Sequence, residues 1–77
     1  MRYKIILTTV QDVCEFVKKM SRYPFDIDLY YGHIVLDAKS IMGVLAVGLN
    51  KQMELCVHAD RTTVFEHEIG QYMCLCA

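Results

Sequence analysis

The sequence has no excess of charge of either sign and no long apolar run. Its 77 residues hold 8 Lys and Arg against 9 Asp and Glu, so it lacks the basic field that attracts nucleic acid or anionic lipid. No apolar stretch approaches the roughly 20 residues that a membrane helix needs. The opening residues Met1-Arg2-Tyr3-Lys4 lead into a strand-like stretch rather than a signal peptide. We therefore expect a cytoplasmic protein with neither nucleic acid nor membrane as a partner.

The spacing of the four cysteines is not that of a disulfide framework or a zinc site. They are Cys14, Cys56, Cys74 and Cys76. Without a C-x-x-C pair, reduced thiols are the favoured interpretation. The alternative is a metal site that combines Cys74 and Cys76 with His58 or His67, for which a lone C-x-C is weak support. The sequence also lacks a Ser/His/Asp set and a nucleotide-binding loop, so we expect no metal, no cofactor and no enzymatic activity.

The single proline, Pro24, separates a helical pattern from a strand pattern. Before it, the run from Tyr3 to Leu7 predicts a strand, and Thr9 stands three residues ahead of Asp12, as a capping residue would. Apolar residues then recur at helical spacing, which predicts an amphipathic helix that ends near Arg22. These residues are Val13, Phe16, Val17 and Met20.

After Pro24 the apolar period becomes two. Residues Phe25 to Tyr31 and Ile34 to Ala38 predict two strands joined at Gly32 as a hairpin. Ser40 is placed to cap a short helix from Ile41 to about Gly48. A turn at Asn50-Lys51 then leads to a fourth strand, in which Met53, Leu55 and Val57 alternate with Glu54, Cys56 and His58.

A last helix is predicted from a second possible capping box, Thr63 with Glu66. Its apolar side is expected to carry Phe65, Ile69, Met73 and Cys76, despite Gly70. The resulting order βαββαβα predicts an α+β domain over residues 1–77, in which three helices cover one face of a four-stranded antiparallel sheet. A core of this size is marginal, and the 55% apolar composition offsets that.

The stretch from Lys39 to Val44, Lys-Ser-Ile-Met-Gly-Val, resembles the segment around the regulatory serine of HPr proteins from Gram-positive bacteria. Residues Glu15 to Lys18 also match the first helix of that family in register. The resemblance covers nearly the whole chain. It implies an open-faced β-sandwich of the sugar phosphotransferase system, in which HPr relays phosphate from enzyme I to sugar-specific IIA proteins.

The chain departs from this family where the phosphate is carried. In HPr a histidine at the start of the first helix takes the phosphate, but here Thr9 falls at that position and Gln11 falls where the family has an arginine. About four residues of the preceding loop are missing. A threonine ester is stable, whereas a relay needs the labile phosphoramidate of imidazole. His33, His58 and His67 do not match the carrier position and are interpreted as surface residues, so this site is expected to be degenerate.

Ser40, in contrast, keeps both its motif and its place at a helix start. The resemblance implies phosphorylation of Ser40 by an HPr kinase and binding of a regulatory partner through Lys39, Ile41, Met42 and Leu45. A phosphate on Ser40 is expected to face Lys39. The alternative roles are a plain helix cap for Ser40 and a core position for the apolar residues, and these interpretations remain open.

Two main functions follow from these observations. The first is a non-catalytic regulatory or binding module, similar to the catabolite-repression HPr-like proteins, whose partners are HPr kinase/phosphorylase, a transcriptional regulator or phosphotransferase proteins. The second is a functional phosphocarrier between enzyme I and IIA components. A third interpretation is a small-molecule-binding module with a pocket near Tyr30 and Tyr31 on the open sheet face. The chain is expected to be a monomer or a weak homodimer.

Overall fold

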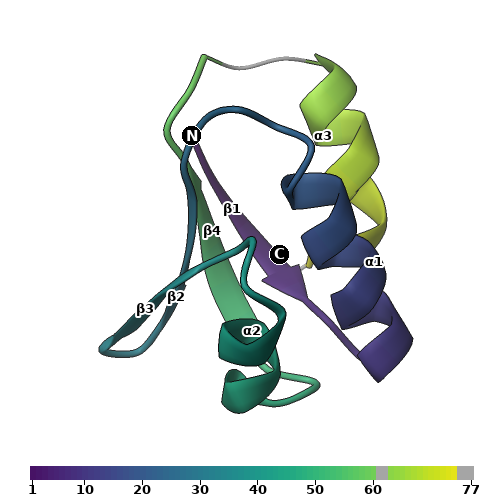
Figure 1. The fold of residues 1–77 in the computed structure, drawn as a ribbon, viewed down its shortest axis with the longest axis vertical. Coiled ribbons are helices and arrows are strands. Elements are labelled where there is room, and N and C mark those ends of the chain that lie inside the picture. The colour runs from purple at the N-terminus through teal and green to yellow at the C-terminus, as the bar shows by residue number, and fades with distance from the viewer. Residues whose placement is uncertain (61–62, 75–77) are drawn as a thin grey trace.

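The computed structural model describes residues 1–60 and 63–74, and the strands and helices follow one another in the predicted order (Figure 1). They are β1 (Arg2–Ile6), α1 (Val10–Met20), β2 (Ile27–Tyr31), β3 (Ile34–Asp37), α2 (Ile41–Val47), β4 (Gln52–Val57) and α3 (Thr63–Ile69), followed by a 3-10 turn, η1 (Gly70–Tyr72). Within the described ranges, no helix combines the length and apolar character that crossing a membrane requires.

The sheet is antiparallel throughout, with the strand order β1-β4-β2-β3. The central strand β4 pairs on one side with β1, where Tyr3 lies opposite Leu55, and on the other with β2, where Leu29 also lies opposite Leu55. Because side chains alternate along a strand, one face of the sheet is apolar and the other is polar. The predicted α+β fold with helices on one face is confirmed.

The core lies between the apolar sheet face and the helices. Helix α1 contributes the four apolar residues predicted from its spacing, all of which are buried. Phe16, which is fully buried, meets the ring of Tyr72 edge-on at 5.5 Å between ring centroids. The largest fully buried side chains are Phe16, Phe65, Ile5, Leu7, Met20, Ile27, Leu29, Met53, Leu55, Ile69, Val13 and Val44. Tertiary packing of these residues therefore joins every helix to the sheet.

The two helix starts predicted from Thr9 and Ser40 are confirmed. The Thr9 hydroxyl accepts a hydrogen bond from the Asp12 amide at 3.0 Å, and the Ser40 hydroxyl accepts one from the Gly43 amide at 3.2 Å. Each bond satisfies an amide that has no partner within its helix. Helix α1 ends at Met20, slightly before the predicted end, with a tight turn over the next residues.

The prediction for the last helix was wrong at both ends. Thr63 is the first residue of α3 rather than its cap. The α-helix ends at Ile69, and Gly70 begins the 3-10 turn, as the low helix propensity of glycine favours. Met73 is extended and forms a bridge with Ile5 of β1, so it does not continue the apolar side of α3. Cys76, the last residue of the predicted helix, lies outside the described residues.

Candidate functional site

The N-terminus of α1, where Thr9 and Gln11 lie, is closed by its own side chains. The Thr9 hydroxyl caps the helix, and the Thr8 hydroxyl donates a hydrogen bond to a carboxylate oxygen of Asp12 at 2.7 Å. That bond from Thr8 is the main cause that holds the pKa of Asp12 below its ordinary value of 3.8. Gln11 is exposed, and its amide donates to Glu15 at 3.3 Å. A negative carboxylate therefore occupies the end of the helix that attracts anions.

The three histidines lie away from this helix start. His33 is in the turn between β2 and β3, His58 follows the end of β4, and His67 is in the last turn of α3. All three are exposed, as the sequence predicted. The chemistry available at the start of α1 is thus limited to hydroxyl, amide and carboxylate groups, none of which forms the labile phosphoramidate of a phosphate relay.

Ser40 lies at the start of α2 and is exposed to solvent. Its hydroxyl caps the helix through Gly43, and this glycine also keeps the space around the hydroxyl open. A Cβ added at Gly43 would lie 3.2 Å from Ser40 Oγ and 3.5 Å from Ser40 Cβ, which is a tight contact. The glycine in the middle of α2 therefore gives room to the serine hydroxyl of its own helix.

Lys39, next to Ser40, is held by the loop that follows α1. Its ammonium group donates to the carbonyl oxygen of Tyr23 at 2.7 Å, and its backbone amide donates to a carboxylate oxygen of Asp37 at 2.9 Å. The sequence predicted that this ammonium group would face a phosphate on Ser40. In the unmodified chain the ammonium group is bound to a carbonyl 16 residues away in sequence, and the contact with a phosphate stays a prediction. The long stem of Lys39 thus connects the start of α2 to the end of α1.

The exposed side of α2 is apolar. The side chain of Met42 is 82% exposed, and those of Ile41 and Leu45 are 41% and 38% exposed, whereas Val44 on the opposite side is 1% exposed and belongs to the core. We call Ile41, Met42 and Leu45 the α2 patch. Ser40, the N-cap residue, directly precedes the patch at the start of this short helix. Of the two sequence interpretations, the structure favours a surface position for these three residues over a core position.

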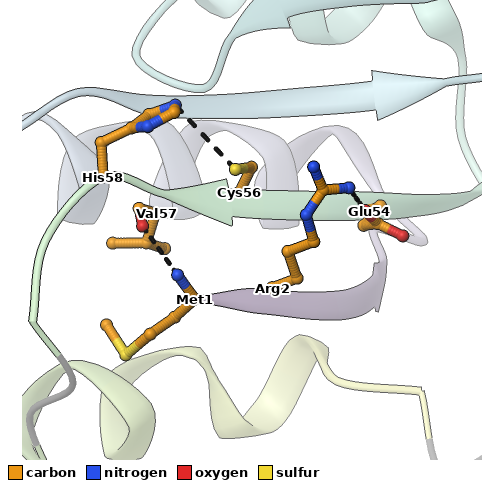
Figure 2. Close-up of polar contacts among 6 residues, drawn as sticks. All are labelled: Met1, Arg2, Glu54, Cys56, Val57 and His58. Atoms are coloured by element: carbon orange, nitrogen blue, oxygen red, sulfur yellow. Dashed lines mark hydrogen bonds and ion pairs between the residues drawn. The ribbon is translucent and has the colours of Figure 1, made fainter.

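The polar face of the sheet carries a cluster that the sequence did not predict (Figure 2). Cys56 of β4 lies opposite Arg2 of β1 and opposite Asp28 of β2, and its sulfur is 3.9 Å from Nε2 of His58. The same His58 nitrogen is 2.9 Å from a carboxylate oxygen of Asp28, and Arg2 pairs with Glu54. These neighbours come from three strands, so only the register of the sheet brings them together.

The open sheet face has a hollow of about 350 Å³ rather than an enclosed pocket. Its lining residues are Lys4, Tyr30, Gly32, Gln52, Met53 and Glu54. Tyr30 therefore lies where the small-molecule interpretation placed it. Tyr31 does not, because alternation along β2 directs it to the other face, where it packs against the core. That interpretation thus loses one of its two tyrosines.

The three cysteines in the described part of the chain are free thiols and form no disulfide. Cys14 is exposed, Cys56 is buried and Cys74 is partly buried. The alternative metal site that combined Cys74 with Cys76 involves a residue outside the described part of the chain. Among residues 1–60 and 63–74, no three His, Cys, Asp or Glu side chains are arranged to hold a metal ion. His58 and Asp28 form a hydrogen-bonded pair beside Cys56.

Tyr23, whose carbonyl holds Lys39, is expected to ionise near pH 12. Burial and the hydrogen bond from its hydroxyl to Glu68 raise the pKa of Tyr23 from 10.0 to about 12. A raised pKa means that the folded state favours the neutral phenol, so this stabilisation is complete below pH 10 and is lost as the pH rises toward 12. Tyrosinate absorbance during a pH titration measures the step. In Tyr23→Phe, the tyrosinate absorbance gained near pH 12 should decrease by the amount that one tyrosine contributes. An unchanged titration curve for this variant contradicts the assignment.

One family model matches the chain over part of its length. The family model described as the PTS HPr component phosphorylation site matches residues 13–64. This range is about two thirds of the chain. It contains Ser40 and all of α2, but it begins after Thr9 and Gln11. The matched part of the chain is therefore the part that carries the α2 patch.

Three solved structures share the fold. The phosphocarrier protein HPr from Bacillus anthracis is 15% identical with a TM-score of 0.74, and the match covers 96% of each chain. The histidine-containing phosphocarrier protein of Mycoplasma is 17% identical with a TM-score of 0.73, over 92% of this chain and 89% of that one. HPr-C-His from Thermoanaerobacter tengcongensis is 21% identical with a TM-score of 0.68, over 78% and 75%.

Proposed function

Because this chain belongs to the PTS HPr family, we propose that it is a non-catalytic binding module whose recognition of a protein partner is controlled by phosphorylation of Ser40. The observation that carries this proposal is that Ser40 is exposed at the start of α2, the helix whose exposed residues form the α2 patch. A phosphate adds close to two negative charges and three acceptor oxygens to this surface. A phosphate on Ser40, beside the apolar α2 patch, changes the charge of this surface and therefore changes which protein partner can bind there.

The start of α1 supports a binding role over a phosphate relay. Thr9 uses its hydroxyl as the helix cap, and the carboxylate of Asp12 is held in its ionised form by Thr8. An incoming phosphate dianion is repelled by that carboxylate, and the threonine offers only a stable ester. We therefore assign no phosphate transfer to this end of the molecule and no enzymatic activity to the chain.

The partners that this proposal requires are proteins. An HPr kinase/phosphorylase modifies Ser40, and a transcriptional regulator or another phosphotransferase protein reads the modified α2 patch. The hydrogen bond from the Lys39 ammonium group to the carbonyl of Tyr23 holds this side chain in place, and the neutral carbonyl leaves the ammonium charge uncompensated. The proposal places the protein in the cytoplasm, where these partners and ATP are present.

The experiment that tests the proposal measures intact mass after incubation with an HPr kinase and ATP. A parallel sample receives enzyme I and phosphoenolpyruvate. We expect one phosphate from the kinase and none from enzyme I, and we expect Ser40→Ala to abolish the modification completely. Ser21→Ala is the matched control, since Ser21 is also exposed and is the only other serine in the sequence.

The outcomes separate the two main functions. An acid-labile phosphate gained from enzyme I contradicts the binding-module proposal and supports a relay through one of the histidines. A kinase-dependent phosphate that persists in Ser40→Ala contradicts the assignment of the site. Absence of phosphate in both samples contradicts control by phosphorylation and leaves the α2 patch as a plain binding surface.

A further inference from the structure

The two outer strands of the sheet, β1 and β3, differ in whether another segment pairs with their outer side. At the β1 edge, Ile5 forms a bridge with Met73, and the Cys74 amide donates to the carbonyl oxygen of Lys4 at 2.9 Å. Arg2 and Lys4 add positive charge to that edge. At the opposite edge, no strand in the described part of the chain pairs with the outer side of β3 (Figure 1). The sheet is therefore closed at one edge and open at the other.

The open edge is short and ends in Asp37, but it lacks three other features that prevent strand pairing between molecules. These features are a lysine, a proline and a bulge. Strand β3 has none of these in its sequence Ile34-Val35-Leu36-Asp37, and it pairs with β2 without a bulge. The side chains of Ile34 and Val35 are 50% and 57% exposed. An exposed edge with two large apolar residues is suited to pairing with another strand.

The hairpin register shows which backbone groups are available. Gly32, with φ of +59°, begins the two-residue turn that Tyr31 and Ile34 close. Farther along the strand, the Ala38 amide donates to the carbonyl oxygen of Ile27 at 2.9 Å. Hydrogen-bonded residues alternate along an antiparallel pair, so the even-numbered residues of β3 bond toward β2. The amide and carbonyl groups of Val35 consequently point away from the sheet.

We propose that β3 pairs with β3 of a second copy of this chain, in antiparallel orientation about Val35. In this register Val35 lies opposite Val35 of the second copy, and Ile34 lies opposite Leu36. Two residues from the centre, His33 of each copy lies opposite Asp37 of the other. Imidazole donates a hydrogen bond to a carboxylate whether or not it is protonated. The strand is therefore complementary to itself in hydrogen bonding as well as in apolar contacts.

This complementarity is the reason to choose a second copy as the occupant of the edge. A two-fold axis through Val35 repeats each contact, so two His33–Asp37 pairs flank the central valines. The result is a continuous sheet of eight strands, twice the four of one copy. Four residues on each side form a small interface, which corresponds to a weak and reversible dimer. The dimer uses β3 rather than the Ser40 hydroxyl, so it can exist whether or not the proposed phosphorylation occurs.

Sedimentation analysis over a concentration series from roughly 10 µM to roughly 1 mM tests the proposal. Val35→Lys should abolish association, because two lysines would lie directly opposite each other. The matched control is Val64→Lys on α3, since Val64 is 68% exposed and lies outside the sheet. His33→Glu should weaken the dimer roughly 2- to 30-fold, and His33→Lys should strengthen it over the same range, because each changes two cross-strand pairs.

Amide chemical shifts identify the surface that associates. With rising concentration, the signals of residues 33–37 should move while those of α2 stay in place. His33 lies in an exposed turn, so its variants are expected to keep the fold, which circular dichroism verifies. A chain that stays monomeric to roughly 1 mM overturns the proposal, as does an association that Val35→Lys leaves intact. Shifts confined to α2 overturn it in favour of a dimer through the α2 patch.

Discussion

Phe16→Ala is expected to lower the free energy of unfolding by about 3–5 kcal/mol. The side chain of Phe16 is fully buried in the middle of α1, with the ring of Tyr72 edge-on against it. Its removal leaves a cavity between α1 and the turn that follows α3, and the surrounding backbone is held by sheet and helix hydrogen bonds. A chain of 77 residues has a total stability of roughly 4–12 kcal/mol, so the variant loses a large part of it.

Chemical denaturation followed by circular dichroism measures this loss. Phe25→Ala is the matched control, because Phe25 is the same residue type but only partly buried, and a smaller decrease is expected. Equal decreases for the two variants would contradict the central position of Phe16. A decrease below about 1 kcal/mol for Phe16→Ala would show that the α1 face packs loosely.

The features predicted correctly from sequence depend on residues that are close together in the chain. Thr9 with Asp12, and Ser40 with Gly43, form caps within three positions, so the local pattern contains all the partners. The alternation of β4 likewise places Leu55 on the core face without reference to other strands. Element order and helix starts follow from such local rules, and they define the fold class.

The features that the sequence did not predict depend on contacts between distant residues. The helical spacing of Met73 from Ile69 predicts a helix, but Met73 pairs with Ile5 near the other end of the chain. The bond from Lys39 to Tyr23 requires the packing of the loop after α1 against the start of α2. In both cases, tertiary contact outweighs a local preference.

The cluster around Cys56 has the same origin. His58 is two residues from Cys56 in sequence, and the pattern indicated that both lie on one face of a strand. Asp28 and Arg2 join them only because β2 and β1 pair with β4 in one particular register. A shift of two residues in that register would keep the apolar side chains on the core face but would separate Arg2 or Asp28 from Cys56, and the alternation within one strand does not exclude it.

Met42→Asp is expected to reduce the kcat/KM of an HPr kinase for Ser40 by about tenfold or more, provided that Ser40 is the modified residue as proposed. Met42 is the most exposed member of the α2 patch, at 82%, so its side chain is available to a partner and contributes little to the core. Aspartate near a helix start interacts favourably with the helix dipole, so the fold is expected to persist. The loss therefore reports on contact with the kinase rather than on unfolding.

Two further variants separate apolar contact from charge. Met42→Ala removes the apolar contact alone, and a several-fold decrease is expected for it. Val64→Asp places the same charge on an exposed valine of α3, outside the α2 patch, and should leave kcat/KM unchanged. If Met42→Asp is impaired but Met42→Ala is not, the kinase avoids negative charge without using the patch. If neither Met42 variant changes kcat/KM, the kinase reaches Ser40 without contacting Met42, and other residues near the serine provide the docking contacts. Met42 is 82% exposed, so a change in core packing cannot mask the loss of a contact with the kinase.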